Sequence, residues 1–321
     1  MTSQNVNTLS REFEEISIKV PWGFLSGRWY GPRNVRPILA LHGWQDNLGT
    51  FDTLIPLMPS YVGVLAIDHP GHGRSSHLPD GVMYHSISHF VYSIFLVMKE
   101  YNWDKVSIIG HSMSSLYGFL FAALYPEKVD MFIGIDLLKP RYRQPSTEIG
   151  IMQYKFDKFF VATERSREIA FKEPPSFTYE EMKEKLYQGS LESIDKDKLH
   201  HILDRNITKS EQYPDKYYFS RDDRVKFYVE FVATPEYSKE MARRIKAPFL
   251  SIKGGASEFF IEDHYDEVLE VLKTNNPNFE TFILTEGTHH LHLNNADKIC
   301  DVVNAFIEKH RPIEKEIVAK L

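Results

Sequence analysis

Short apolar segments recur along the chain, separated by longer stretches in which apolar residues repeat with helical spacing. Continuous apolar runs of this kind are typical of strands buried on both faces of a parallel sheet. Runs of this type predict strands at 38–41, 62–67, 106–109, 131–135, 249–252 and 281–284. Two earlier segments, 15–20 and 25–30, flank Pro21-Trp22-Gly23 and predict an opening hairpin.

Between the predicted strands, apolar residues fall at i, i+3, i+4, i+7 and i+8, as in 116–124 and again in 299–307. Strands that alternate with helices predict an α/β fold with a mostly parallel central sheet flanked by helices. The alternation stops between about 138 and 236, where helical patterns and aromatic residues dominate. We therefore expect residues 1–137 and 237–321 to form the α/β core.

Residues 138–236 are expected to form a helical cap, or lid, inserted into that core. Thr178-x-x-Glu181 within this stretch has the pattern of a capping box at a helix start. Aromatic side chains are frequent here, and most of them are expected to pack within the cap. A minority is expected to line a cavity between cap and core, where an apolar part of a ligand would lie.

The strand at 106–109 leads into Gly110-His111-Ser112-Met113-Ser114, and a helical pattern follows directly. This strand–turn–helix context is the one that the G-x-S-x-G elbow of the α/β-hydrolase fold requires. Ser114 stands where the motif usually has its second glycine. A serine in a buried turn also occurs for purely structural reasons, but the flanking strand and helix favour Ser112 as a catalytic nucleophile.

A histidine on the loop after the last strand is the base that this fold requires. The loop after 281–284 contains Thr288-His289-His290-Leu291-His292. Histidine suits general-base chemistry because its pKa lies near neutral pH. We predict His289 as the base, with His290 as the second candidate and His292 as a packing or capping residue.

The oxyanion donors are expected at two chain turns. The strand at 38–41 ends in His42-Gly43-Trp44, where the fold supplies one backbone N–H, and the residue after the nucleophile supplies the other. We therefore predict the N–H groups of Trp44 and Met113 as the oxyanion hole. His42 is interpreted as a structural residue that orients the loop.

The acid that orients the histidine has two candidates. Asp136 directly follows the strand at 131–135, in a position that looks like the strand-six acid of haloalkane dehalogenases. Glu258 lies on the loop after 249–252, where many α/β-hydrolases carry their acid. Both stay open, with Asp136 preferred, although an aspartate at a strand end often only caps the following loop.

The composition of the chain limits the classes of partner that we expect. The 321 residues carry a formal net charge of -6 without long like-charge blocks, which argues against a nucleic-acid partner. No apolar run reaches the ~18 residues of a membrane span. His69 and His72 lack a third ligand at a suitable spacing, so we expect no metal and no cofactor. The expected partner is a small-molecule substrate, bound by a monomer or a homodimer.

The expected location is the cytoplasm or the peroxisome. The polar start of the chain, Met1 to Ser10, has no secretory apolar region, and the single cysteine, Cys300, excludes a disulfide within the chain. The final Ala319-Lys320-Leu321 is similar to the Ser-Lys-Leu peroxisomal address.

Several segments together resemble the animal serine hydrolase-like family of α/β-hydrolases. The matching segments cover nearly the whole chain and are weakest in the expected cap; they are Val20-Pro-Trp-Gly23, Leu41-His-Gly-Trp-Gln-Asp-Asn47, Phe51-Asp-x-Leu-Ile-Pro-Leu57, Gly71-His-Gly-x-Ser-Ser-His77, Ile109-Gly-His-Ser112 and Gly287-x-His289. The resemblance implies a cap-bearing hydrolase with its serine at Ser112 and its histidine at His289, and it names no substrate.

The expected function is therefore a serine hydrolase, and more narrowly a carboxylic-ester hydrolase that acts on a small to medium apolar substrate through an acyl-enzyme at Ser112. A serine nucleophile argues against epoxide hydrolase and dehalogenase chemistry, which use an aspartate. Two alternatives stay open because this fold hosts many activities. One is a non-hydrolytic ligand-binding protein, and the other is a cofactor-free lyase, oxygenase or luciferase-type enzyme.

Overall fold

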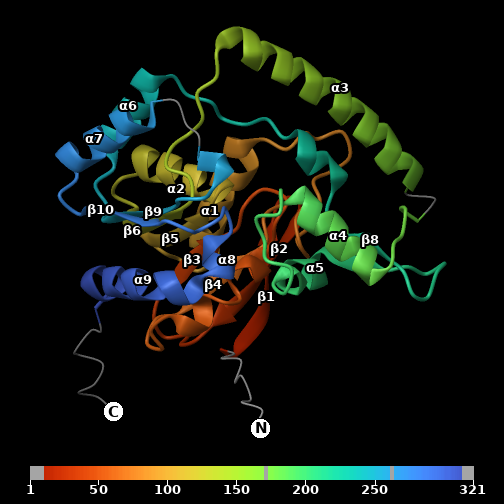
Figure 1. The fold of residues 1–321 in the computed structure, drawn as a ribbon, viewed down its shortest axis with the longest axis horizontal. Coiled ribbons are helices and arrows are strands. Elements are labelled where there is room, and N and C mark those ends of the chain that lie inside the picture. Colours follow the sequence, from red (N-terminus) through yellow and green to blue (C-terminus); the bar gives the residue numbers. More distant parts are fainter. Residues whose placement is uncertain (1–10, 170–172, 261–263, 313–321) are drawn as a thin grey trace.

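The computed structural model describes residues 11–169, 173–260 and 264–312, and its centre is an eight-stranded sheet (Figure 1). The strand order is β1-β2-β4-β3-β5-β6-β9-β10. β1 pairs antiparallel with β2 and β2 with β4, while the other pairings are parallel. The strands are β1 (Phe13–Val20), β2 (Gly23–Tyr30), β3 (Ile38–Leu41), β4 (Val64–Ile67), β5 (Val106–His111), β6 (Val129–Ile135), β9 (Phe249–Gly254) and β10 (Phe279–Leu284).

The predicted strands are all present, with ends that differ from the expected ones by a residue or two. The central strands are buried on both faces, as β3, β4 and β5 show along their whole length. This burial explains why they read as continuous apolar runs and not as alternating patterns. The expected α/β-hydrolase fold with a mostly parallel sheet is confirmed.

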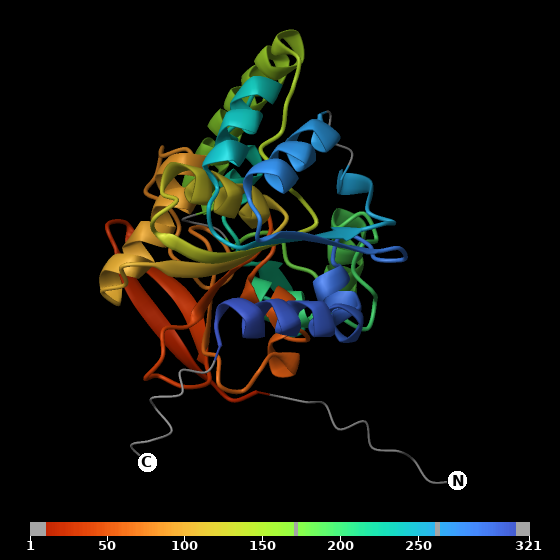
Figure 2. The ribbon, with the colours of Figure 1, turned by 90° about the vertical axis from the view of Figure 1, so that its left-hand side faces the viewer.

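Helices cover both faces of the sheet (Figure 2), and an apolar core lies on each face. One face is covered by α1 (Tyr92–Glu100), α2 (Met113–Leu124), α6 (Pro235–Arg244) and α7 (Tyr265–Asn275). The other is covered by α9 (Ala296–His310) and by the turns between Leu48 and Leu57. The helical spacing of 116–124 and 299–307 is explained by this burial, since Phe119, Leu120 and Val303 point into the two cores.

Between β6 and β9 the chain leaves the sheet. This segment forms α3 (Pro145–Ile169), α4 (Tyr179–Gly189) and α5 (Leu199–Asn206), and Figure 1 shows α3 arching over the rest of the molecule. The capping box at Thr178 is present, with both reciprocal hydrogen bonds to Glu181. A short hairpin of β7 (Ile207–Lys209) and β8 (Tyr217–Phe219) was not expected, because three-residue strands are too short to produce a period.

The carboxyl ends of β5, β6 and β9 meet at one edge of the sheet, where ligands of α/β proteins bind. The N–H of Ser112 donates to the carbonyl of Ile135 over 2.8 Å, and the N–H of Asp136 donates to that of Ile252 over 2.7 Å. Parallel pairing thus places the residues that follow β5 and β6 side by side.

Within the described part of the chain, no helix has the length and apolarity needed to cross a membrane. The two terminal segments on which location was inferred, Met1 to Ser10 and Ala319 to Leu321, lie outside the described residues.

Candidate active site

Ser112 lies in the sharp turn between β5 and α2, with a backbone conformation of φ 52 and ψ -117. A non-glycine residue in this region is strained, and such strain is typical of functional turns. The turn is tight: a Cβ on Gly110 would lie 2.4 Å from the carbonyl oxygen of Ser114. Glycine is therefore required at position 110, as the elbow motif predicts.

Ser114, the residue that departs from the motif, fits the elbow through its hydroxyl. Its Oγ donates to the carbonyl of His42 over 2.5 Å and lies 2.7 Å from Nε2 of His69. His42 in turn accepts the N–H of His69 on Nε2 over 2.9 Å. All three residues are fully buried. The serine side chain therefore bonds the elbow to the loop after β3, and His42 has the structural position expected for it.

His289 lies between Ser112 and Asp136. Its Nε2 is 2.9 Å from Oγ of Ser112, and its Nδ1 is 2.6 Å from Oδ2 of Asp136. Asp136 is fully buried and also accepts hydrogen bonds from the N–H of Gly254 over 2.8 Å and from the hydroxyl of Ser257. These contacts fix the carboxylate and, through it, the orientation of the imidazole ring.

Glu258, the alternative acid, lies in a different environment. It is exposed at the start of the turn Glu258–Phe260, and among the described residues Nδ1 of His289 hydrogen-bonds to Asp136. The residue after it, Phe259, stacks its ring on His289 at 4.1 Å between centroids. The loop after β9 therefore contributes Ser257 and Phe259 to the site, and the geometry favours Asp136 as the acid.

Burial favours the uncharged forms of the two ionisable partners. It lowers the pKa of His289 to about 3, with Arg141 adding to the effect, and it raises the pKa of Asp136 to about 7. Hydrogen bonds from Ser257 and Gly254 partly offset the effect of burial on Asp136. A neutral imidazole beside Ser112 can accept a proton, and the carboxyl group beside it stabilises the imidazolium that results.

The expected oxyanion residues, Trp44 and Met113, both line the cavity that contains Ser112 and His289. Gly43 lets the loop approach the elbow, since a Cβ there would lie 3.2 Å from Cβ of Ser112. Trp44 also ties this loop to the chain before α6, because its Nε1 donates to the carbonyl of Val225 over 2.9 Å.

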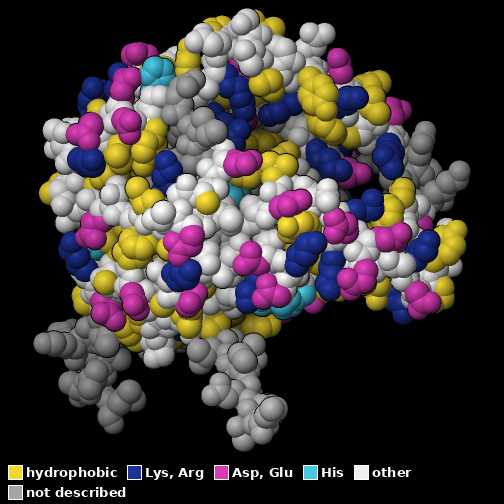
Figure 3. Space-filling model, in the orientation of Figure 1, with side chains coloured by type: hydrophobic (Ala, Val, Ile, Leu, Met, Phe, Trp, Pro, Cys, Tyr) yellow, Lys and Arg dark blue, Asp and Glu magenta, His cyan; other side chains and the backbone are white. Residues whose placement is uncertain are grey.

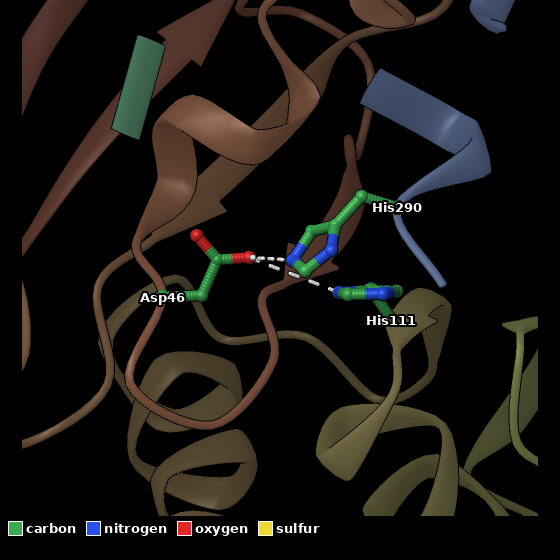
Figure 4. A group of neighbouring side chains, drawn as sticks. All are labelled: Asp46, His111 and His290. Carbon is green, nitrogen blue, oxygen red and sulfur yellow. Dashed lines mark ion pairs between the residues drawn. The ribbon is translucent and has the colours of Figure 1, made fainter. Parts of the chain in front are cut away.

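A group that the sequence did not predict lies beside this site (Figure 4). Oδ2 of Asp46 is 3.8 Å from Nδ1 of His111 and 3.8 Å from Nε2 of His290. Within the described residues, Asp46 Oδ2 and His111 Nδ1 are buried without a hydrogen-bond partner. Two imidazoles and a carboxylate form a donor set that could hold a transition metal. His69 and His72, the pair considered in the sequence, are not part of it.

Comparison with known proteins shows the family of the chain. The family model described as alpha/beta hydrolase fold matches residues 36–296. A probable serine hydrolase from Drosophila melanogaster is 33% identical over 92% of this chain and 88% of its own length, and a serine hydrolase-like protein from Danio rerio is 32% identical over 96% and 93%. The chain belongs to the serine hydrolase-like family of α/β-hydrolases.

Solved structures support the same fold. A hypothetical protein from Pseudomonas aeruginosa PAO1 superposes with a TM-score of 0.75 at 25% identity, covering 92% of this chain and 99% of that protein. The thioesterase domain from the curacin biosynthetic pathway superposes with a TM-score of 0.71 at 18% identity, covering 91% and 99%. Membership in the serine hydrolase-like family supports hydrolase activity on a small-molecule substrate.

Proposed function

We propose that this serine hydrolase-like protein is a carboxylic-ester hydrolase with Ser112 as nucleophile, His289 as general base and Asp136 as the acid that orients the base. The observation that carries this proposal is the continuous contact from Oγ of Ser112 to Nε2 of His289 and from Nδ1 of His289 to Asp136, at 2.9 and 2.6 Å. This arrangement of nucleophile, base and acid is the one used in acyl transfer.

In the first half of the reaction, Oγ of Ser112 attacks the ester carbonyl carbon while its proton moves to Nε2 of His289. The carbonyl oxygen becomes an oxyanion, which the N–H groups of Trp44 and Met113 stabilise. Collapse of this intermediate breaks the bond to the leaving oxygen, and His289 returns the proton to the leaving alcohol. Water then repeats the sequence on the acyl-enzyme and releases the carboxylic acid.

The acyl chain is proposed to lie between the core and the segment 138–236, which we propose as the cap. A cavity of about 570 Å³ opens over Ser112, a size suited to a small to medium ligand. Part of its lining is aliphatic and comes from both sides, with Met113, Leu116 and Leu137 from the core side and Leu186, Ile194 and Ile202 from the cap. Such a lining favours an apolar acyl group.

A fluorophosphonate probe tests this proposal directly. The folded protein should be labelled on Ser112, and Ser112→Ala should abolish both labelling and the hydrolysis of p-nitrophenyl esters. A series of acyl chains of increasing length should show an optimum set by the cavity. If the folded protein stays unlabelled while a control hydrolase reacts, the ester-hydrolase proposal fails and a non-hydrolytic ligand-binding function takes its place.

A further inference from the structure

The cavity over Ser112 is rich in positive charge, although the chain as a whole is acidic. The formal net charge of the chain is -6. The cavity is lined by two acidic residues, Asp46 and Glu230, but by six basic ones, which are Arg141, Arg143, Lys155, Lys185, Arg221 and Lys226. Figure 3 shows Lys and Arg side chains around the hollow beneath α3.

Half of these basic side chains are neutralised by carboxylates within the protein. Arg141 and Arg143 both pair with Glu230, and Arg143 also pairs with Glu148 at 2.9 Å. Lys226 pairs with Asp223 at 2.8 Å. These contacts account for Glu230, so Asp46 is the one remaining acidic residue of the lining.

Lys155, Lys185 and Arg221 form no ion pair with any described residue. Lys155 lies over the ring of Tyr228 at 4.9 Å, and Lys185 lies over the ring of Phe177 at 4.2 Å. An aromatic face positions a cation without supplying a negative charge. Three cations from α3, α4 and the chain after β8 therefore face one cavity without a carboxylate in ion-pair contact among the described residues. Asp46 and Asp223 still act on Arg221 at longer range, and Glu230 acts on Lys155.

Arg221 is the most constrained of the three. One terminal nitrogen donates to the carbonyl of Gln45 over 2.9 Å, and its Nε is buried without a hydrogen-bond partner among the described residues. Burial lowers the pKa of Arg221 to about 10, so it stays charged at neutral pH in spite of its surroundings. Gln45 directly follows Trp44, so this guanidinium is attached to the loop of the proposed oxyanion hole.

The buried Nε of Arg221 has no hydrogen-bond partner among the described residues, and a bound anion would supply one. The planar guanidinium of arginine matches carboxylate and phosphate groups, and cations gathered in a cleft of low dielectric attract anionic ligands. We propose that the cavity binds an anionic acyl substrate, whose carboxylate or phosphate group contacts Arg221, Lys155 and Lys185 while its acyl carbon reaches Ser112. This inference rests on the proposed ester-hydrolase function.

Two substrate pairs test the inference and separate the two sources of negative charge. Mono-p-nitrophenyl glutarate against p-nitrophenyl valerate places a carboxylate on the acyl end. Valeryl-coenzyme A against the valeryl thioester of N-acetylcysteamine places phosphates on the leaving group. We expect the anionic member of at least one pair to be preferred by about tenfold or more in kcat/KM, after correction for intrinsic reactivity, and this preference to fall between about 20 mM and about 500 mM NaCl.

Matched variants identify the residues involved. Arg221→Gln and Lys155→Gln should lower the ratio of anionic to neutral kcat/KM by about tenfold each, the effect of losing one charge-assisted contact. Lys158→Gln is the control for Lys155, since Lys158 lies on the same helix but is exposed. Melting temperatures show that each variant is folded. A preference for the neutral member of both pairs, or a ratio unchanged in Arg221→Gln, would overturn the inference.

Direct binding separates this inference from the proposed function. Ser112→Ala protein, which cannot turn over an ester, should bind glutarate or coenzyme A in calorimetry, and Arg221→Gln should weaken that binding. Labelling of Ser112 together with no binding of either anion at about 10 mM would sink the anionic-substrate inference and leave the ester-hydrolase proposal intact. If the protein binds an anion but the native Ser112 resists labelling, the ester-hydrolase proposal fails and the anion site stands.

Discussion

Replacing Asp136 with asparagine isolates the role of the acid with little other change to the site. Asp136 has φ 57, in the left-handed region that aspartate and asparagine tolerate better than other side chains. The variant should therefore keep the backbone turn. The N–H of Gly254 donates to Oδ1 over 2.8 Å, so the asparagine oxygen is expected to keep that position and its amide nitrogen to face His289.

The amide nitrogen has a specific consequence for the base. In the variant, the amide nitrogen takes the place of Oδ2 of Asp136 and donates a hydrogen bond, whereas Oδ2 accepts one. Nδ1 of His289, 2.6 Å from Oδ2 in the native protein, must then become the acceptor. The proton of a neutral imidazole then lies on Nε2 and points at Ser112, where it blocks proton transfer. In serine proteases the equivalent change costs on the order of 10⁴ in turnover, which corresponds to about 5.4 kcal/mol of barrier.

The assay is hydrolysis of a p-nitrophenyl ester together with the rate of fluorophosphonate labelling. Glu258→Gln is the matched control: this carboxylate is exposed, so turnover should stay within about twofold of the native value. Circular dichroism and the melting temperature of each variant report whether the fold is kept. Equal, modest losses in Asp136→Asn and Glu258→Gln would refute the assignment of Asp136.

Three further predictions concern the elbow, the base and the buried ion pair of Arg205 with Asp68. Gly110→Ala would place a Cβ 2.4 Å from a backbone oxygen, so this variant should abolish labelling of the serine. Gly150→Ala is the control, because its Cβ meets nothing within 4 Å. It should leave labelling intact and stabilise the helix by about 0.5–1 kcal/mol in thermal unfolding. The acid limb of kcat/KM should lie below pH 6.5, because burial lowers the pKa of His289 below that value and the base works only when neutral; a limb at or above it contradicts the assignment. Arg205→Met should destabilise the fold by about 3–5 kcal/mol in urea unfolding, because it leaves the fully buried Asp68 without the arginine that contacts it at 2.7 Å. Adding Asp68→Asn to this variant should recover part of the lost stability. A loss under about 1 kcal/mol in Arg205→Met would contradict the prediction.

The sequence predicted the parts of the site that depend on local pattern. The apolar run at 106–109 followed by Gly110-His111-Ser112 contains the strand, the tight turn and the helix start in one stretch, and all three form as expected. The choice between Asp136 and Glu258 depends on a long-range feature. It follows from the parallel register that sets Ile135 beside Ile252, which brings the end of β6 under the loop that carries His289. No local spacing reports that register.

The cations of the cavity were beyond prediction for a related reason. Lys155, Lys185 and Arg221 lie on separate elements, and each one alone is an ordinary charged position of a helix or loop. The aromatic content of residues 138–236 predicted an apolar cavity, and the structure gives two of those rings a further contact. Tyr228 and Phe177 carry Lys155 and Lys185 on their faces, so two of these rings hold cations that line the cavity containing Ser112. An ester that fits this cavity should combine an apolar acyl chain with an anionic group, and a neutral ester should leave the cations of the lining without a contact.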